Sequence, residues 1–372
     1  MSDHVKLSEV CEILNSNVDK KTKENEQKVK LCNFTDVYNN WAITKYTSKK
    51  FMKATATQNE INKFSLKKGY VAITKDSETK DDIGIPTYIA DNFDNVLLGY
   101  HCTLLKPNQK VLNGKFLNAY LNSFYGRKYF SNCASGSGQR YTLTIDTIKD
   151  LNIPLINIET QQKIARTLSV LDQKIENNHK INELLHTLAY KIYEYYFKYK
   201  PKNAKLEQII IENPKSSIMV KNAQKTQDKY PFFTSGDNIL SYPKAIIDGR
   251  NCFLNTGGNA GIKFYVGKAS YSTDTWCICA NEFSDYLYLL LSSIKNHINQ
   301  SFFQGTSLKH LRKNLLKKYH IYMPSAHEIK KFNQIMMPLL TLISINTRTS
   351  KKLEQVRDFL LPLLLTQQVK PQ

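Results

Sequence analysis

Apolar residues recur at alternating steps of four and three along two long stretches of the chain, 153–197 and 323–365. In the first stretch these positions hold Ile164, Leu168, Leu171, Ile175, Asn178, Asn182, Leu185, Ala189, Ile192 and Tyr196. Moving every position by one common offset leads to Phe332, Met336, Leu339, Ile343, Asn346, Ser350, Leu353, Arg357, Leu360 and Leu364. This spacing is a heptad seam with one basic interruption, so the sequence predicts two long helices that pack against each other.

The middle of each seam is polar, with Asn178 and Asn182 in one helix and Asn346 and Ser350 in the other. Pairing the helices with their centres aligned sets polar against polar, and a buried Asn fixes the register of such a pair. If the region between the helices is compact, its two ends lie close together and the second helix returns along the first. We therefore expect antiparallel pairing. The same pattern also fits two separate amphipathic helices, each lying on its own domain.

The seam is long enough to act as a spacer. From residue 164 to residue 196 it spans about 50 Å at a rise of about 1.5 Å per residue. The expected molecule is a pseudo-symmetric dumbbell, with a globular module at each end of the helix pair. Pro338 and Pro362 fall inside the second helix, and we expect Pro338 to bend it near its start without breaking it.

The globular modules mix strands and helices in the same order. The pattern predicts strands at 70–74, 86–90 and 99–105 in the first half and at 251–254, 262–266 and 276–280 in the second. One helix is expected at 115–130 and one at 283–302. Each half opens on a similar segment, VKLSEV from Val5 and AKLEQI from Ala204, so the chain repeats one plan twice. The expected fold class is α+β.

The charge of the chain points to a partner. It has 52 Lys and Arg against 32 Asp and Glu, a formal charge of +20, which is typical of proteins that meet phosphates. Nucleic acid is therefore the expected partner, although a Lys-rich surface that reflects genome composition gives the same charge.

Motifs that would indicate catalysis or metal binding are missing from the sequence. The seven Cys include no pair at the two-residue spacing of zinc or redox motifs, and no carboxylate, metal or nucleophile cluster stands out. The aromatic tetrapeptide with adjacent prolines of an adenine methyltransferase is also missing. We expect a protein without a metal site or catalytic residues. With no apolar signal core and no apolar run of membrane length, it is expected in the cytoplasm.

Several segments, in their order and duplication, resemble the specificity subunit of type I restriction–modification systems, over nearly the whole chain. In the first half they are LKKGYVAI from Leu66, the Gly-rich turn 136–141, Ile153 with Pro154, and ETQQKIARTLSVLDQKI from Glu159. In the second half they are YPFFTSGDNI from Tyr230, GGNAGIKFYVGK from Gly257, GTSLKHL from Gly305, and Met323 with Pro324. The second helix lacks the glutamine pair of the first, which leaves its start open.

The resemblance implies two α/β target recognition domains in a pseudo-twofold arrangement, separated by two antiparallel coiled-coil helices. On this basis we assign 1–157 and 200–325 to the domains, 158–199 and 326–367 to the spacer helices, and 368–372 to a tail. It also implies two modification (methyltransferase) subunits and two restriction (motor-nuclease) subunits as partners on double-stranded DNA. S-adenosylmethionine, ATP and magnesium are expected on those partners, and no cofactor on this chain.

Side chains that read DNA are expected on loops. Lys and Arg set position on phosphates, whereas contacts to base edges read sequence. The candidates are basic or amide residues beside the predicted strands and Gly-rich turns: Lys75, Lys80, Gln139, Arg140, Tyr141, Asn259, Lys263, Lys268, Lys309, His310 and Arg312. Each of them also fits a solvent-facing charge, and Tyr141 fits a core residue.

Two modules about 50 Å apart would address DNA segments one to two helical turns apart. The expected target is bipartite, with a fixed unread gap. It should be asymmetric because the two modules differ in length. The main alternative is a non-catalytic coiled-coil architectural protein that binds nucleic acid without sequence preference.

Overall fold

The computed structural model describes residues 3–136, 139–223, 229–236, 239–305 and 308–369. Parts of the predicted Gly-rich turns (137–138 and 306–307), of the YPFFTSGDNI segment (237–238) and of the tail (370–372) lie outside the described residues. The chain forms two compact units. Unit 1 comprises residues 1–173 and 356–372, and unit 2 comprises residues 174–355.

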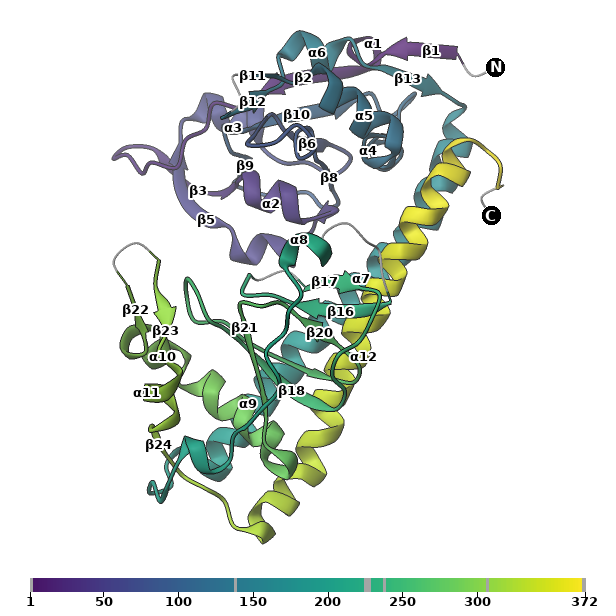
Figure 1. The fold of residues 1–372 in the computed structure, drawn as a ribbon. Helices are drawn as coiled ribbons and strands as arrows, with labels where there is room; N and C mark the ends of the chain where they lie inside the picture. Colours follow the sequence, from purple (N-terminus) through teal and green to yellow (C-terminus); the bar gives the residue numbers. More distant parts are fainter. Residues whose placement is uncertain (1–2, 137–138, 224–228, 237–238, 306–307, 370–372) are drawn as a thin grey trace. The chain divides into compact units, whose positions relative to one another are not determined.

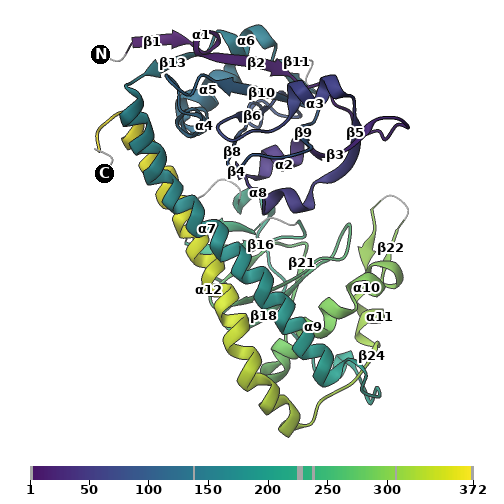
Figure 2. The ribbon, with the colours of Figure 1, turned by 180° about the vertical axis from the view of Figure 1, so that it is seen from behind.

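Two long helices run through both units. Helix α7 (Ile158–Tyr193) continues into a π-helical turn at Glu194–Lys198, and α12 (Ala326–Leu365) is unbroken at Pro338 and Pro362. Figures 1 and 2 show the two helices lying side by side. The prediction of two long, packed helices is confirmed.

Unit 1 is built on strands and short helices that alternate along the chain. They are β1 (Asp3–Lys6), α1 (Leu7–Val10), β2 (Cys11–Asn15), β3 (Gln27–Cys32), α2 (Phe34–Asn39), β4 (Ala42–Ile43), β5 (Met52–Ala56), α3 (Gln58–Phe64), β6 (Val71–Thr74), β7 (Asp76–Ser77), β8 (Pro86–Ile89), β9 (Val96–Leu98), β10 (Cys102–Pro107), α4 (Gly114–Asn122), α5 (Phe124–Cys133), β11 (Ser135–Gly136), β12 (Tyr141–Thr142), α6 (Ile145–Lys149) and β13 (Asn152–Leu155).

Unit 2 follows the same kind of plan with shorter elements. They are β14 (Ala204–Lys205), β15 (Ile211–Glu212), α8 (Val220–Ala223), β16 (Tyr230–Phe233), β17 (Ile239–Tyr242), β18 (Arg250–Asn255), β19 (Ile262–Val266), β20 (Ser270–Tyr271), β21 (Thr275–Cys279), α9 (Ser284–Ser293), α10 (Lys295–Ser301), β22 (Phe303–Gln304), β23 (His310–Leu311), α11 (Lys313–Lys317) and β24 (His320–Ile321).

The strand pairing repeats between the units. The main sheet has the order β2-β10-β6-β8-β4 in unit 1 and β15-β21-β18-β19 in unit 2. A second sheet, β5-β3-β9 or β17-β16-β20, joins one antiparallel and one parallel pair in each unit. In both units the opening strand pairs with the strand just before a long helix, β1 with β13 and β14 with β24. The internal repeat read from the sequence is therefore a repeat of topology.

The predicted strands are confirmed, but one begins later than expected. Strand β10 starts at Cys102, because residues 99–101 form a turn closed by a hydrogen bond from the Cys102 N–H to the Gly99 carbonyl (3.1 Å). This turn carries His101 to the end of the sheet.

The prediction of a single helix in each module is wrong, since each of them is two helices. Between α4 and α5, Ser123 is extended (φ −69°, ψ 165°), and its N–H still bonds the carbonyls of Ala119 and Tyr120. Gly126 then lets α5 turn back closely, because a Cβ there would lie 2.6 Å from the Leu121 Cα. In unit 2 the break falls at Ile294 (φ −104°, ψ 14°) between α9 and α10. Neither break is marked by a proline in the sequence. The spacing of apolar residues therefore continues across both breaks, which is why the sequence predicted one helix in each place.

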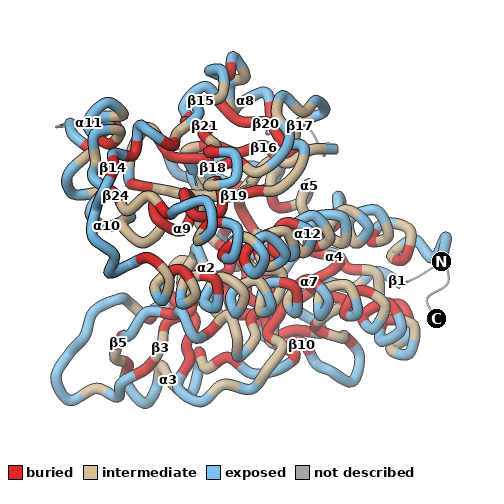
Figure 3. Tube along the Cα trace, turned by 90° about the horizontal axis from the view of Figure 1, so that it is seen from below, coloured by how far each residue is buried: buried red, intermediate tan, exposed pale blue. Residues whose placement is uncertain are grey.

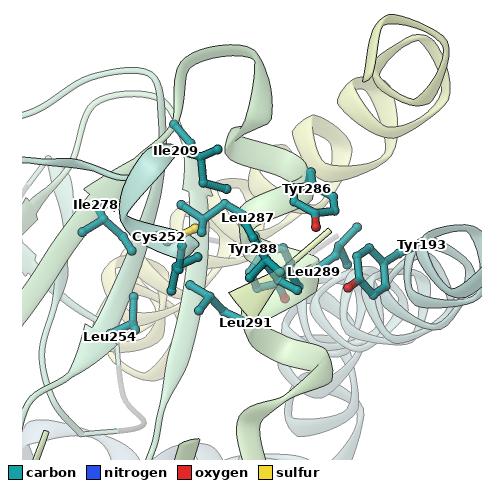
Figure 4. Packing of buried hydrophobic residues seen from close by; sticks show 14 of the residues in the cluster. Tyr193, Ile209, Cys252, Leu254, Ile278, Tyr286, Leu287, Tyr288, Leu289 and Leu291 are labelled. Atoms are coloured by element: carbon teal, nitrogen blue, oxygen red, sulfur yellow. The ribbon is translucent and has the colours of Figure 1, made fainter. Parts of the chain in front are cut away.

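The apolar cores lie between the sheets, the short helices and the long helices. Figure 4 shows Leu287 and Leu291 of α9 packed with Cys252 and Leu254 of β18, while Tyr193 of α7 lies on the other side of α9. In unit 1, Ile164 and Leu168 of α7 and Leu361 and Leu364 of α12 belong to one core cluster with α4 and β10. The long helices are thus part of each unit's core.

The contacts between α7 and α12 show that the two helices run in opposite directions. Arg357 pairs with Asp172, Ser350 with Asn178 and Asn346 with Asn182, so numbers fall in α12 as they rise in α7. The Asn178 amide donates to the Ser350 hydroxyl (3.2 Å), and the Asn346 amide donates to the Asn182 side-chain carbonyl (3.0 Å). The helices are antiparallel, with polar set against polar.

The seam positions lie inside the helix pair. Figure 3 shows buried and exposed residues alternating along α7 and α12. Every one of the predicted seam residues is buried or half-buried, including Phe332 and Met336, which are fully buried. The basic interruption at Arg357 is accommodated because its guanidinium lies 3.9 Å from the centre of the Trp41 ring and 3.3 Å from a carboxylate oxygen of Asp172.

Candidate nucleic-acid interface

The candidate DNA-binding residues that the sequence predicted in the first half of the chain lie in and beside a small three-stranded sheet of unit 1. It has the order β11-β12-β7 and pairs Tyr141 with Ser77 and Thr142 with Asp76. Lys75 precedes β7, Lys80 follows it, and Gln139 and Arg140 lead into β12. Residues separated by about 60 positions in the sequence are thus held on one edge of the unit.

Backbone geometry explains why glycine stands at the turn into this sheet. A Cβ on Gly136 would lie 2.2 Å from the Arg140 carbonyl oxygen, too close for any side chain. The hydrogen bond from the Leu143 N–H to the Lys75 carbonyl (2.8 Å) ties the other end of β12 down. Gln139 and Arg140 lie between these two contacts, and their side chains are exposed.

Arg140 takes part in a cluster with Asp76 and His101. Its Nη2 lies 3.2 Å from the Asp76 Oδ2 and 2.8 Å from the His101 Nδ1. The same Asp76 oxygen lies 2.7 Å from the His101 Nδ1, and the Tyr100 ring lies against the imidazole at a tilt of 41°, with centroids 3.7 Å apart. The carboxylate thus faces both the guanidinium and the imidazole.

The two lysines of this edge differ in their surroundings. Lys80 is exposed, and its ammonium lies 5.5 Å from the centre of the Tyr141 ring. Lys75 is half-buried and lies near the Cys102 thiol. Burial raises the pKa of that thiol, and the positive charge of Lys75 opposes the rise. No carboxylate lies within 4 Å of either ammonium in the part of the chain that the structure describes. Both charges remain available to an anion.

In unit 2 the Gly-rich loop before β19 meets the segment before β23. The Gly258 N–H donates to the Lys309 carbonyl (2.9 Å), and Gly257 bridges to His310. These contacts bring Asn259, Lys309 and His310 together, and all three side chains are exposed. Arg312 is exposed just beyond β23.

Two of the nominated residues in unit 2 lie elsewhere or are occupied. Lys263 turns inward, since its ammonium donates to the Thr234 carbonyl (2.8 Å) and to the Asn255 side-chain oxygen (3.2 Å). Lys268 is exposed at the far end of β19 from Asn259, about 16 Å away along a five-residue strand. The structure therefore groups Asn259, Lys309 and His310 and leaves Lys268 apart.

Sequence reasoning missed the residues that orient these side chains. Asp76 lies within a charged loop, and His101 lies 25 positions away, so only the folded sheet brings them to Arg140. In unit 2, the Asn255 amide donates to the Asn259 carbonyl (3.1 Å), and the Asn299 side chain accepts from the Ala260 N–H (2.8 Å). In the sequence, Gly261 was the available sign of this close packing, because a Cβ there would lie 2.2 Å from the Asn255 amide nitrogen.

Within the described residues, no group of three or more His, Cys, Asp or Glu is arranged to hold a metal ion. None of the helices in those residues is both long and apolar enough to cross a membrane. The cysteines are all free, and Cys133 is the exposed one among them.

Comparison with known proteins identifies the family. The model of the "Type I restriction modification DNA specificity domain" matches residues 2–187 and 202–355, most of the chain. The chain is 25% identical to the type I restriction enzyme MjaIX specificity subunit of Methanocaldococcus jannaschii over 341 residues, which cover 80% of this chain and 74% of that protein. It is 30% identical to the HindI specificity subunit of Haemophilus influenzae over 149 residues, which cover 40% of this chain and 32% of that protein.

The fold agrees with this assignment. The crystal structure of a type I restriction–modification system S subunit from M. genitalium superimposes with a TM-score of 0.57 at 16% identity, covering 98% of this chain and 96% of that one. Specificity subunits are the non-catalytic subunits of these enzymes, and the cofactors belong to the modification and restriction subunits. The chain belongs to the family of type I restriction–modification DNA specificity subunits.

Proposed function

We propose that this chain reads a bipartite, asymmetric DNA target, one part with each module, and that the paired helices set the unread gap between the parts. The observation that carries the proposal is the repeated topology. In each unit an opening strand pairs with the strand that leads into a long helix, and the two helices pack antiparallel. A protein built twice in this way offers two reading surfaces.

The two surfaces carry different side chains. The edge of unit 1 presents Gln139, Arg140 and Lys80, whereas the loops of unit 2 present Asn259, Lys309 and His310. Direct readout depends on the donors and acceptors that reach the base edges, so different sets select different base pairs. This difference supports an asymmetric target. Lys268 and Arg312 are proposed as phosphate contacts, while Lys263 would act by holding its loop.

The net charge supports a large electrostatic share of the affinity. With a formal charge of +20, the chain should release many counterions from DNA, so its affinity should fall steeply as salt rises. The architectural alternative predicts the same slope but no preferred sequence. Salt dependence alone therefore does not separate the two functions.

Partner subunits are expected on the exposed faces of the long helices. Each helix carries a second heptad row, one position before the seam, in which exposed apolar residues alternate with polar ones. Its exposed apolar members are Val170, Ile181, Leu184 and Leu188 in α7 with Tyr195 in the π-helical turn that follows, and Ile335, Leu342, Ile345, Val356 and Phe359 in α12. Exposed apolar rows of this kind favour packing of further helices. One row on each helix supports the proposal of two modification subunits, which in turn would recruit two restriction subunits.

Footprinting on a random DNA library tests the proposal. The chain, assembled with its modification subunits in the cytoplasmic complex that we propose, should protect two patches at constant spacing within the selected sequences. Methylome sequencing of the host with and without this gene should reveal the same two-part motif. Uniform protection without a selected sequence would support the architectural alternative and contradict the proposal of a two-part target.

A further inference from the structure

Arg140, at the edge of unit 1, is held by contacts at one of its guanidinium nitrogens, Nη2. We propose that Arg140 reads a guanine in the first half-target and that Asp76 and His101 are its positioning residues. The inference rests on the proposed function and adds a base, a reading residue and the two side chains that orient it.

The cluster fixes one nitrogen of the guanidinium. Asp76 and His101 both lie at the Arg140 Nη2, at 3.2 and 2.8 Å, while the Arg140 side chain remains 55% exposed. The Asp76 and His101 side chains are only 14% and 23% exposed. The anchor is thus largely buried, whereas the Arg140 side chain that it holds is more than half exposed.

The ion pair is not needed to hold the backbone of the small sheet. Strand β12 is already paired on both sides, with β11 and with β7, and the Leu143 N–H bonds the Lys75 carbonyl. Asp81 and Asp82, further along the same loop, are engaged away from Arg140. Asp82 accepts from the Tyr38 hydroxyl (2.9 Å), and the Asp81 carbonyl accepts from Arg127 (2.7 Å). Asp76 is the loop carboxylate that the structure pairs with Arg140.

The donors that remain free on Arg140 match guanine. The Asp76 oxygen and the His101 nitrogen lie 2.7 Å apart on one side of the Arg140 Nη2, so they face one of its two N–H groups and leave the other free. A guanidinium has five N–H donors in a planar fork, and the free Nη2 N–H has a parallel neighbour on Nη1 or on Nε. Two parallel donors are what the O6 and N7 acceptors of guanine take in the major groove. A fork that is already oriented loses less conformational entropy when it binds. The geometry therefore favours base reading at Arg140.

Arg140 and Lys80 differ in whether a negative charge balances their own. The carboxylate of Asp76 offsets the Arg140 charge and weakens its attraction for phosphate, whereas the Lys80 ammonium lies beside the neutral Tyr141 ring. Lys80 should contact phosphate and position the protein, and Arg140 should discriminate between bases.

The experiment uses the assembled enzyme and the target determined for the wild type by methylome sequencing. Binding is measured on oligonucleotides in which each base pair of the first half-target is changed in turn. Wild type should discriminate at one G·C pair by roughly 5- to 150-fold. Arg140→Lys and Arg140→Ala should lose that discrimination alone. Asp76→Asn should reduce it, and Asp76→Glu should restore part of it.

Lys80→Ala is the matched control, since it removes a charge from the same edge. It should weaken binding to all sequences alike and lower the slope of log affinity against log salt by about one, with base discrimination kept. Circular dichroism and thermal melting show whether each variant folds. Full discrimination at every position in Arg140→Lys, or unchanged discrimination in Asp76→Asn, overturns the inference. A wild type without any two-part target overturns the proposed function instead.

Discussion

Arg357 shows how a single residue that breaks a sequence pattern can be stabilised by its surroundings. It occupies a seam position, yet its guanidinium stacks on Trp41 and pairs with Asp172. Burial raises the pKa of Asp172, while the Arg357 charge and hydrogen bond oppose that rise. Arg357 therefore joins α12 both to α7 and to the loop that carries Trp41 in unit 1.

Replacing Arg357 should destabilise unit 1. Arg357→Ala should lower the free energy of unfolding by about 2 kcal/mol, the magnitude of a desolvated cation–π contact. Arg357→Lys keeps the charge but loses the planar stack, so it should recover only part of the loss. A double-mutant cycle with Trp41→Leu, followed by chemical denaturation, measures the coupling. Additive losses in that cycle would contradict the stacking contribution.

Two leucines of the same helix differ in what they contribute to stability. Leu168 is 3% exposed in the unit 1 core, whereas Leu184 is 71% exposed. Leu168→Ala should cost about 2–5 kcal/mol in the free energy of unfolding, because it leaves a cavity. Leu184→Ala in the isolated chain should change it by less than about 0.5 kcal/mol. Equal losses in urea denaturation would show that the helix faces are misassigned.

At the scale of elements, the long helices combine three surfaces. The seam pairs the helices, part of it also packs into the modules, and the second heptad row, called the outer row from here on, carries exposed apolar side chains. His186 belongs to the module-facing surface, since its ring lies edge-on to Tyr288 of α9 with centroids 6.2 Å apart. The contact between α7 and α9 therefore contains a titratable group.

Unfolding of unit 2 should depend on pH through His186. Burial lowers the pKa of His186 below its ordinary value of 6.5, so the unfolded chain takes up the proton more readily. The free energy of unfolding should therefore decrease as the pH falls from about 7 to about 5. His186→Gln should make this decrease smaller, while His327→Gln, at an exposed position of α12, should leave it unchanged. Equal decreases in wild type and His186→Gln would rule out this origin.

The outer row of α7 should be needed for assembly. Leu184→Glu places a charge in the middle of the exposed apolar row, so the chain should no longer co-purify with a modification subunit. Leu184→Met keeps an apolar side chain of similar volume and should assemble as wild type does. Both variants should melt at the wild-type temperature as isolated chains. Normal co-purification of Leu184→Glu would move the partner surface elsewhere.

At the scale of the whole molecule, the length of the helix pair should set the gap in the target. Seven residues inserted immediately before Asn178 and seven immediately after Ser350 keep both seams in register and add about 10 Å to each helix. The gap should lengthen by about three base pairs, at about 3.4 Å per base pair, with both half-targets unchanged.

Methylome sequencing of cells that carry the lengthened chain measures both quantities. An insertion in α7 alone is the control, since it shifts one seam against the other and should abolish a functional complex. An unchanged gap, or altered half-targets, would contradict the spacer function of the helices.

The sequence by itself determined the features that depend on local periodicity. Residues at heptad spacing lie on one helix face whatever surrounds them, so the seam and its polar centre could be predicted from residues such as Asn178 and Ser350. The antiparallel pairing followed from the expectation that the region between the helices is compact. The duplicated plan followed from the same local patterns. Fold class and family were therefore within reach of the sequence.

Only the tertiary structure decided the features that depend on contacts between distant residues. Ser123 and Ile294 end helices whose pattern continues, because the packing of α5 and α10 selects the break. Lys263 turns inward because Thr234 and Asn255 meet its ammonium, and Asp76 and His101 reach Arg140 only once β7 and β12 pair. Periodicity is set by neighbours in the chain, whereas the orientation of a side chain is set by whatever the fold places beside it.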